Sequence, residues 1–149
     1  MTTAFQIVES LAECARRIRI ANGFRTDAGE TVHKNVRLFS ASDVHPLAFI
    51  GYPGADSVKR YAGSARVEKA AEFQLSMEYE VQPDDDLDPA ADAYRDLVVA
   101  VFGPGSPGIP NVVSFEYESE QHIPRLNGGK FGQMSIFILI RWIENVGQE

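Results

Sequence analysis

One stretch of the chain alternates apolar and polar residues without a break, and it constrains the fold more than any other feature. Between Ala71 and Val81 the odd-numbered residues are apolar and the even-numbered residues are polar or acidic. A period of two places successive side chains on opposite faces of a β-strand. The segment therefore predicts a long strand with one face against a core and the other, acidic face toward solvent.

Three further segments are typical of strands. Residues 31–39 alternate around β-branched side chains, residues 47–52 form a short apolar run, and residues 112–123 alternate again. Residues 54–63 are polar, contain glycine and carry basic side chains, which indicates a loop or a ragged edge strand.

The C-terminal segment 133–143 differs because both of its faces are apolar. Ile136 and Ile138 lie on one face of the predicted strand, while Phe137 and Leu139 lie on the other. The core covers only one face of such a strand, so we expect a second subunit on the other.

Two segments have helical periodicity, residues 3–21 and residues 90–102. An aspartate-rich stretch precedes the second helix, and the glycine- and proline-rich residues 103–110 end it. Residues 125–130 then predict a hairpin loop. Separate groups of strands and helices favour an α+β fold with a mainly antiparallel sheet and two flanking helices, in the order α-β-β-β-α-β-β. At 149 residues we expect one domain, 1–149.

The same periodicities predict which side chains form the core. The residues expected to be almost fully buried are Leu75, Met77, Leu97, Val98, Phe115, Ile136 and Ile138.

Charge and cysteine content narrow the function classes. The net charge of -7 opposes tight, sequence-independent binding to DNA, which depends on basic residues. A single cysteine, Cys14, excludes an internal disulfide and a cysteine-based zinc site. No secretory signal and no membrane-spanning run is visible, so we expect a cytosolic protein without a membrane partner.

No catalytic or metal-binding motif is recognisable in the sequence. His33, His45 and His122 are far apart and lack ligand spacing, and Cys14 lies beside the apolar stripe of a helix as a core residue would. We therefore expect no enzyme activity, no metal and no cofactor.

The order of elements resembles a known family over nearly the whole chain. An N-terminal helix is followed by the turn Phe24–Gly29, a strand, and a polar stretch before the apolar run Leu47–Ile50. The alternating strand Phe73–Val81, a helix through Tyr94–Phe102 and a terminal strand pair complete the pattern. This layout resembles the tail terminator, or tail completion, proteins of long-tailed bacteriophages and prophages, also called minor tail protein U-like proteins.

The resemblance implies a structural function in an α+β fold. Such proteins form a hexameric ring on the head-proximal end of the tail tube, stop its polymerisation and present the surface that docks with the head connector. The implied partners are other copies of the chain, the tail tube protein and the head-connector or neck protein, and DNA passes through the lumen without specific binding. The implied location is the bacterial host cytoplasm during assembly and then the virion tail.

A ring of this kind needs two different patches that meet head to tail. We expect the basic residues of segment 54–66 to meet the acidic face of the long strand on a neighbour, and the second apolar face of the last strand to supply a further patch. The candidate subunit-interface residues are Lys59, Arg60, Arg66, Glu72, Glu78, Glu80, Phe137 and Leu139.

Two alternatives stay open at this stage. A phage neck or head-closure protein also forms rings and has a similar sequence pattern. A small ligand-binding or enzymatic α+β domain unrelated to phage would assemble its site only in three dimensions. A deep pocket with convergent polar groups favours that last alternative, whereas a flat surface favours assembly.

Overall fold

The computed structural model describes residues 2–34, 44–60, 65–126 and 129–146. It confirms an α+β fold built from one mostly antiparallel sheet and two α-helices. The elements in chain order are α1 (Ala4–Arg16), two short 3-10 helices η1 (Ile20–Asn22) and η2 (Ala28–Glu30), β1 (Val32–His33), β2 (Leu47–Gly51), β3 (Asp56–Arg60), β4 (Arg66–Glu80), α2 (Leu87–Phe102), β5 (Ser114–Ile123) and β6 (Phe131–Asn145).

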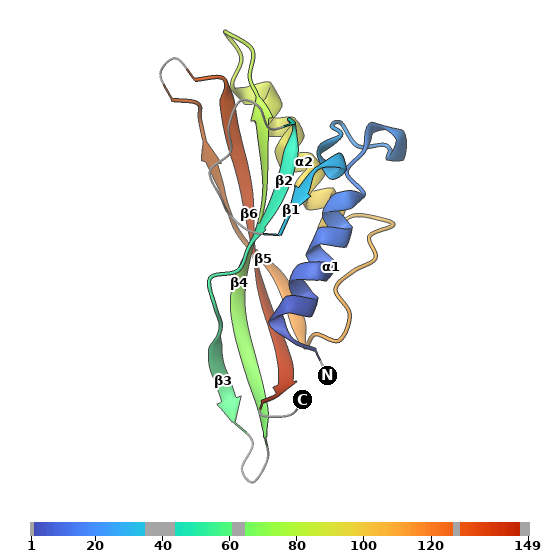
Figure 1. Ribbon diagram of the computed structural model, residues 1–149, viewed down its shortest axis with the longest axis vertical. Coiled ribbons are helices and arrows are strands. Elements are labelled where there is room, and N and C mark those ends of the chain that lie inside the picture. Colours follow the sequence, from blue (N-terminus) through green and yellow to red (C-terminus); the bar gives the residue numbers. More distant parts are fainter. Residues whose placement is uncertain (1, 35–43, 61–64, 127–128, 147–149) are drawn as a thin grey trace.

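The sheet is organised around two long central strands. Its order is β1-β2-β4-β6-β5, and β3 pairs with the beginning of β4 beyond the end of β2. β4 and β6 are antiparallel along their whole length, from the Arg66–Asn145 pair to the Glu80–Phe131 pair. Among the described strands, only β1 and β2 run parallel to each other. The long β4–β6 pair gives the molecule its elongated shape, with β3 at one end (Figure 1).

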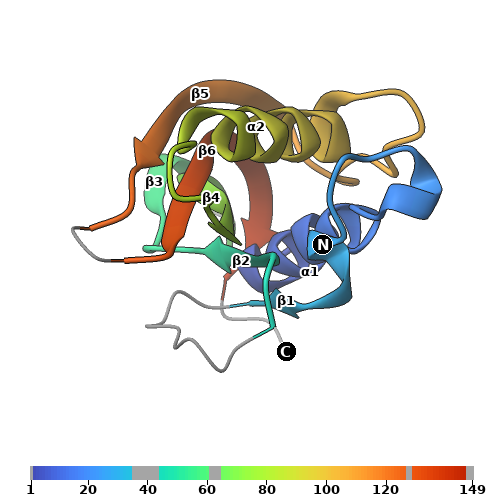
Figure 2. The same cartoon turned by 90° about the horizontal axis from the view of Figure 1, so that it is seen from above.

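Both α-helices pack on the same face of this sheet, which we call the helix face (Figure 2). The odd-numbered residues of β4 and the even-numbered residues of β6 point into the core, so Phe73, Leu75, Ile138 and Trp142 are fully buried. The alternation predicted for residues 71–81 is therefore confirmed. The opposite surface of the sheet, the far face, carries the even-numbered side chains of β4.

Five of the seven predicted core residues are fully buried, but Val98 and Phe115 are only half-buried. α2 turns a stripe that includes the small residues Ala93 and Ala100 toward the sheet, which leaves Val98 on its flank. Phe115 lies on the outer strand β5, where its ring stacks on that of Phe102 with centroids 5.5 Å apart. A side chain on an edge strand has a neighbouring strand on one side only, which accounts for the partial exposure.

Several boundaries differ from the prediction, among them the end of α1 and the start of β4. α1 ends at Arg16, and the chain returns close to this end at Gly29, where a Cβ would lie 2.5 Å from the Arg16 carbonyl oxygen. Gly23, at a φ of +90°, ends η1 instead of a longer α1. β4 begins at Arg66, because its first residues pair with both β3 and β6. The predicted order therefore lacks one strand before α2.

Other predictions fall partly outside the described residues. The predicted strand 31–39 is a strand at Val32–His33, and its residues 35–39 lie outside the described part. The same is true of residues 40–43 and of the centre of the predicted hairpin loop, residues 127–128. Within the described ranges, no helix is long and apolar enough to cross a membrane.

Candidate subunit interface

On the far face of the sheet, the side chains near β1 and β2 are buried. Leu47 and Phe49 of β2 are buried on this face, and Ser76 and Ser135 are fully buried on the paired strands β4 and β6. The two serine hydroxyls are 2.6 Å apart and satisfy each other by a hydrogen bond. This half of the face is therefore part of the interior.

Glu78, one of the predicted interface residues, belongs to the closed half. Its Oε1 lies 2.6 Å from Nε2 of His45, and only 17% of its side chain is exposed. The His45 ring also stacks on Phe131 with centroids 4.1 Å apart. Glu78 thus has a partner within its own chain.

The other half of the far face is open. Leu139 on β6 lies directly between Glu72 on β4 and Glu116 on β5, and Phe137 lies opposite Gln74. Leu139 and Phe137 are half-buried, whereas both glutamates are exposed. These five residues form an apolar centre with acidic margins on both sides, which we call the open patch.

A hollow adjoins the open patch where the chain leaves the sheet between β2 and β3. Gly51 pairs with Gln74 and Asp56 pairs with Ala70, so residues 52–55 have no strand partner on β4. The hollow has a volume of about 420 Å³, and its lining residues are Gly51, Tyr52, Pro53, Glu72, Gln74 and Phe137. Two predicted interface residues, Glu72 and Phe137, therefore share one concave surface.

The predicted basic residues lie at the end of the molecule that β3 occupies. β3 pairs with the beginning of β4 and with no other described strand. In the register, Lys59 is opposite Glu68 and Arg60 is opposite Val67, so both belong to an edge strand and not to a loop. The register shifts at Val58, which is 45% exposed. We call β3 together with residues 66–70 of β4 the arm.

The structure thus sorts the predicted residues into groups. Glu72, Phe137 and Leu139 share the open patch, while Lys59, Arg60 and Arg66 belong to the arm. Glu80 lies at the opposite end of β4 from the arm, paired with Phe131. Glu116 was missed because its position beside Leu139 depends on the register of β5, which sequence periodicity does not fix.

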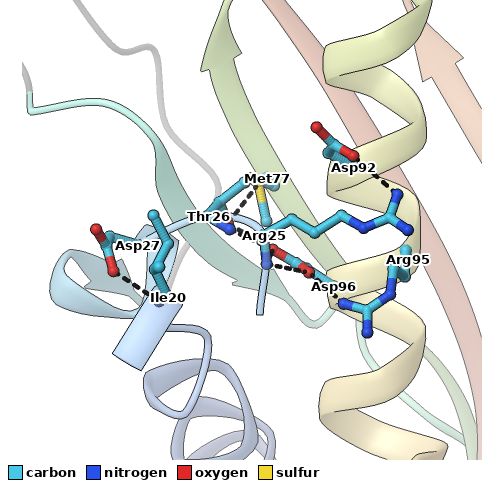
Figure 3. A network of polar contacts seen from close by, with 8 residues as sticks. All are labelled: Ile20, Arg25, Thr26, Asp27, Met77, Asp92, Arg95 and Asp96. Atoms are coloured by element: carbon cyan, nitrogen blue, oxygen red, sulfur yellow. Dashed lines mark hydrogen bonds and ion pairs between the residues drawn. The ribbon is translucent and has the colours of Figure 1, made fainter. Parts of the chain in front are cut away.

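No pattern in the sequence indicated Asp96, the only charged residue that is fully buried among the described residues. It lies on the inner side of α2 and accepts hydrogen bonds from the backbone N–H groups of Arg25 and Thr26, at 3.0 and 2.9 Å, and from the Thr26 hydroxyl at 2.7 Å (Figure 3). Nη1 of Arg95 lies 3.3 Å from Oδ1 of Asp96. The carboxylate anchors the turn after α1 to α2, and all its partners are within the fold.

A second hollow lies near the β5–β6 connection, and its arginine is engaged within the chain. It measures about 530 Å³ and includes Glu80, Asp86 and Arg125 in its lining. Arg125 Nε already pairs with Asp86 at 2.9 Å, and the same guanidinium donates to the Pro83 carbonyl. No group of three metal-ligating side chains occurs within the described residues. Burial raises the pKa of the Cys14 thiol, which disfavours the reactive thiolate.

Comparisons with known proteins show a likeness in fold. No family model matches the chain, and no curated protein sequence matches it. Among solved structures, a chain from a structure titled "Virion of native gene transfer agent (GTA) particle" superposes with a TM-score of 0.58 at 11% identity. The match covers 93% of this chain and 95% of that chain. The two chains therefore share a fold over almost their full lengths.

Proposed function

We propose that this protein is a structural component of a phage-type virion, and specifically a tail terminator. In this role, six copies form a ring on the head-proximal end of the tail tube, end its polymerisation and present the docking surface for the head connector. The observation that carries the proposal is the likeness to a chain of a gene transfer agent virion, which spans nearly the whole of both chains.

The two groups of interface residues support ring formation. A closed ring requires a heterologous contact, in which one patch of a subunit meets a different patch of the next. The arm and the open patch are different in position and opposite in charge, as such a contact requires. Asp96 and Glu78 bind partners within their own chain, which also agrees with a structural function.

The charge of the chain suits a ring through which DNA passes. A net charge of -7 on each of six subunits repels the phosphate backbone, so DNA slides through without sticking. The proposed partners are therefore other copies of the chain, the tail tube protein and the connector, with no cofactor and no specific contact to nucleic acid.

The test removes the gene from the phage or prophage that carries it and measures tail lengths by electron microscopy. We expect overlong tails without heads, and recovery of uniform tails when the gene is supplied in trans. Tails of normal length that fail only to join heads would overturn the terminator role and favour a neck protein. Normal virions in the absence of the gene would reject both.

A further inference from the structure

We propose that the outer edge of β5 is a docking site for an extended, basic segment of a different protein, which joins the sheet as a further strand. The inference goes beyond the proposed function and does not depend on it. Three observations carry it: an unpaired backbone edge, glutamates without a basic partner, and aromatic rings exposed beside the strand.

The first observation is the free edge of the sheet. β5 is the last strand in the sheet order, and among the described strands it pairs with β6 alone. Alternate residues of an edge strand turn their N–H and C=O groups away from the neighbouring strand, where these groups can pair with another chain. The ten residues of β5 therefore offer a row of main-chain donors and acceptors to an extended segment.

This edge is also uncovered by side chains. Six consecutive residues of β5, 116–121, are exposed. Because successive side chains of a strand point to opposite faces, this part of β5 is open on both faces. Figure 2 shows β5 at the rim of the curved sheet, outside α2. An incoming strand can therefore approach β5 without displacing another described element.

The second observation is the charge along this edge. Glu116, Glu118 and Glu120 are all exposed, and none of them forms an ion pair within the described part of the chain. Glu118 is left out of the pairing with β6, and Glu120 accepts a hydrogen bond from the Tyr117 hydroxyl at 2.9 Å. Acidic side chains on an edge strand repel a second acidic strand and attract a basic one. The edge is therefore selective for basic segments.

The third observation is an aromatic surface where α2 meets β5. Residues 97–102 of α2 are all apolar, a composition typical of a buried helix, yet Phe102 is 37% exposed. Its ring packs against those of Phe115 and Tyr117, with centroids 5.5 and 6.3 Å away. A strand added beside β5 places one side chain directly opposite Tyr117, at a Cβ separation of about 4.5–5.5 Å. An apolar side chain at that position covers the exposed rings.

Together these observations define the chemistry of the segment. Its backbone is extended, because it must pair with the free edge of β5. Its side chains alternate between apolar residues on the helix face, opposite Tyr117, and basic residues on the far face, beside Glu116. The pairing of Phe115 with Ile140 and of Glu116 with Leu139 places these two kinds of side chain on opposite faces.

A second copy of the chain is less suited to this edge. An antiparallel pair of two β5 strands brings the glutamates of one copy opposite those of the other, and like charges directly opposite each other are destabilising. The net charge of -7 adds a general repulsion between copies. Charge therefore favours a basic partner over self-pairing.

The test titrates the isotope-labelled, full-length protein with a synthetic heptapeptide of alternating lysine and valine and follows its amide NMR signals. We expect a dissociation constant below about 1 mM, with the largest shifts in β5. Amide hydrogen exchange should slow at alternate β5 residues, because their outward N–H groups gain acceptors. Absence of binding at about 1 mM, or shifts centred away from β5, would overturn the proposal.

Control peptides separate strand addition from general attraction. A peptide of the same composition with its lysines and valines in two blocks should bind at least about tenfold more weakly. Two further forms carry backbone N-methyl groups, one at every valine and the other at every lysine, and each lacks the donors of one strand edge. At least one of these forms should lose affinity at least about tenfold. Full binding by the block peptide or by both methylated forms would rule out strand addition.

Charge variants of the protein locate the site. Glu116→Lys with Glu118→Lys should raise the dissociation constant of the alternating peptide at least about tenfold. The matched control is Glu80→Lys with Asp84→Lys, two exposed residues away from β5 whose change alters the net charge equally and should leave binding as in the wild type. Thermal unfolding verifies the fold of both variants. Equal weakening in the two variants would reject β5 as the site.

The same exchange measurement identifies a second copy as the occupant. In that case β5 amides become protected as the protein concentration rises without peptide, and the alternating peptide does not compete. This result would overturn the proposal, because the edge would then be a contact between copies.

Discussion

Asp96 shows how a single buried charge fixes a connection that sequence periodicity does not reveal. A carboxylate inside a protein is tolerated only where donors compensate the loss of its hydration. Here the donors are two backbone N–H groups and the Thr26 hydroxyl, all from the turn after α1. The residue therefore links α1, through its turn, to α2.

We expect Asp96→Ala to lower the free energy of unfolding by about 2–4 kcal/mol, because it leaves three donors without an acceptor in the interior. Urea denaturation measures the change. Asp92→Ala is the control: its ion pair with Arg25 is 3.0 Å long but about half-exposed on both sides, so its loss should cost below about 1 kcal/mol. Equal losses in the two variants would contradict the anchoring role of Asp96.

Glu144 gives the fold a defined dependence on pH. Burial raises its pKa, but hydrogen bonds from Lys69 and Trp142 outweigh this and hold the pKa below the ordinary value of 4.5. The backbone N–H of Ala4 contributes in the same direction, so the carboxylate also connects the start of α1 to β6. Because the folded pKa is depressed, this stabilisation is complete above pH 4.5 and is lost as the pH falls through the folded pKa.

Glu144→Gln should therefore reduce the dependence of stability on pH in acid. We expect the unfolding free energy of the wild type to fall more steeply than that of the variant as the pH drops below 4.5. Urea midpoints measured at a series of pH values provide the comparison, and Glu30→Gln, whose carboxylate is half-exposed, is the control. Parallel curves for wild type and Glu144→Gln would show that the carboxylate has no such role.

At the scale of elements, the long strands and the short apolar strand β2 could be predicted, whereas β1 is shorter in its described part than the predicted strand and β3 was left open between a loop and an edge strand. The alternation of residues 71–81 identifies the greater part of β4, because every odd-numbered residue of that strand from Ala71 to Tyr79 is buried. β3 and β1 have five and two residues, and pairing with a longer neighbour rather than periodicity makes them strands. The stripe of α2 was misplaced toward Val98 because alanines, weak signals of burial in a sequence, face the sheet.

The contact between α2 and the sheet should dominate stability. Leu97 and Ile138 are fully buried in one core, and truncating either leaves a cavity that the close-packed surroundings cannot fill. We expect Leu97→Ala and Ile138→Ala each to cost about 2–5 kcal/mol in urea denaturation. Leu126→Ala, at a site 82% exposed, should cost below about 0.5 kcal/mol. Losses below about 0.5 kcal/mol for both Leu97→Ala and Ile138→Ala would contradict this packing.

β3 should be less protected than the strands beside it. It is a five-residue edge strand with one partner, whereas the β4 residues around Phe73 lie over the main core. Amide hydrogen exchange should therefore be faster in β3 than around Phe73 in the free protein, because local opening of β3 breaks few contacts. If the arm enters a neighbouring subunit, its protection should rise on assembly. Equal protection of β3 and Phe73 in the free monomer would refute the first expectation.

At the scale of the whole molecule, the sequence indicated the kinds of residue in the proposed interface but not their arrangement. It identified the second apolar face of the last strand and the basic segment before β4. It did not separate Glu72 from Glu78, because only the tertiary structure places His45 against one of them. The pairing of Glu116 with Leu139 likewise depends on a register that a shift near Tyr117 alters.

The variant Arg60→Glu tests whether a basic residue of the arm is needed for tail completion. Arg60 pairs with Val67 at the outer edge of the sheet, and a charge change at such a position should alter the unfolding free energy by within about 0.5 kcal/mol. If the arm meets the open patch of a neighbouring subunit, the same change places a negative charge against the acidic margins of that patch, so ring closure should weaken. In a phage that lacks the gene, the Arg60→Glu protein should be folded and expressed yet restore fewer tails of uniform length than the wild type.

The control is Glu80→Lys, which also reverses a charge but lies away from the patch, and it should complement fully. Uniform tails with Arg60→Glu would exclude this arginine from the ring contact, and overlong tails with both variants would show that tail completion responds to charge in general rather than to this interface.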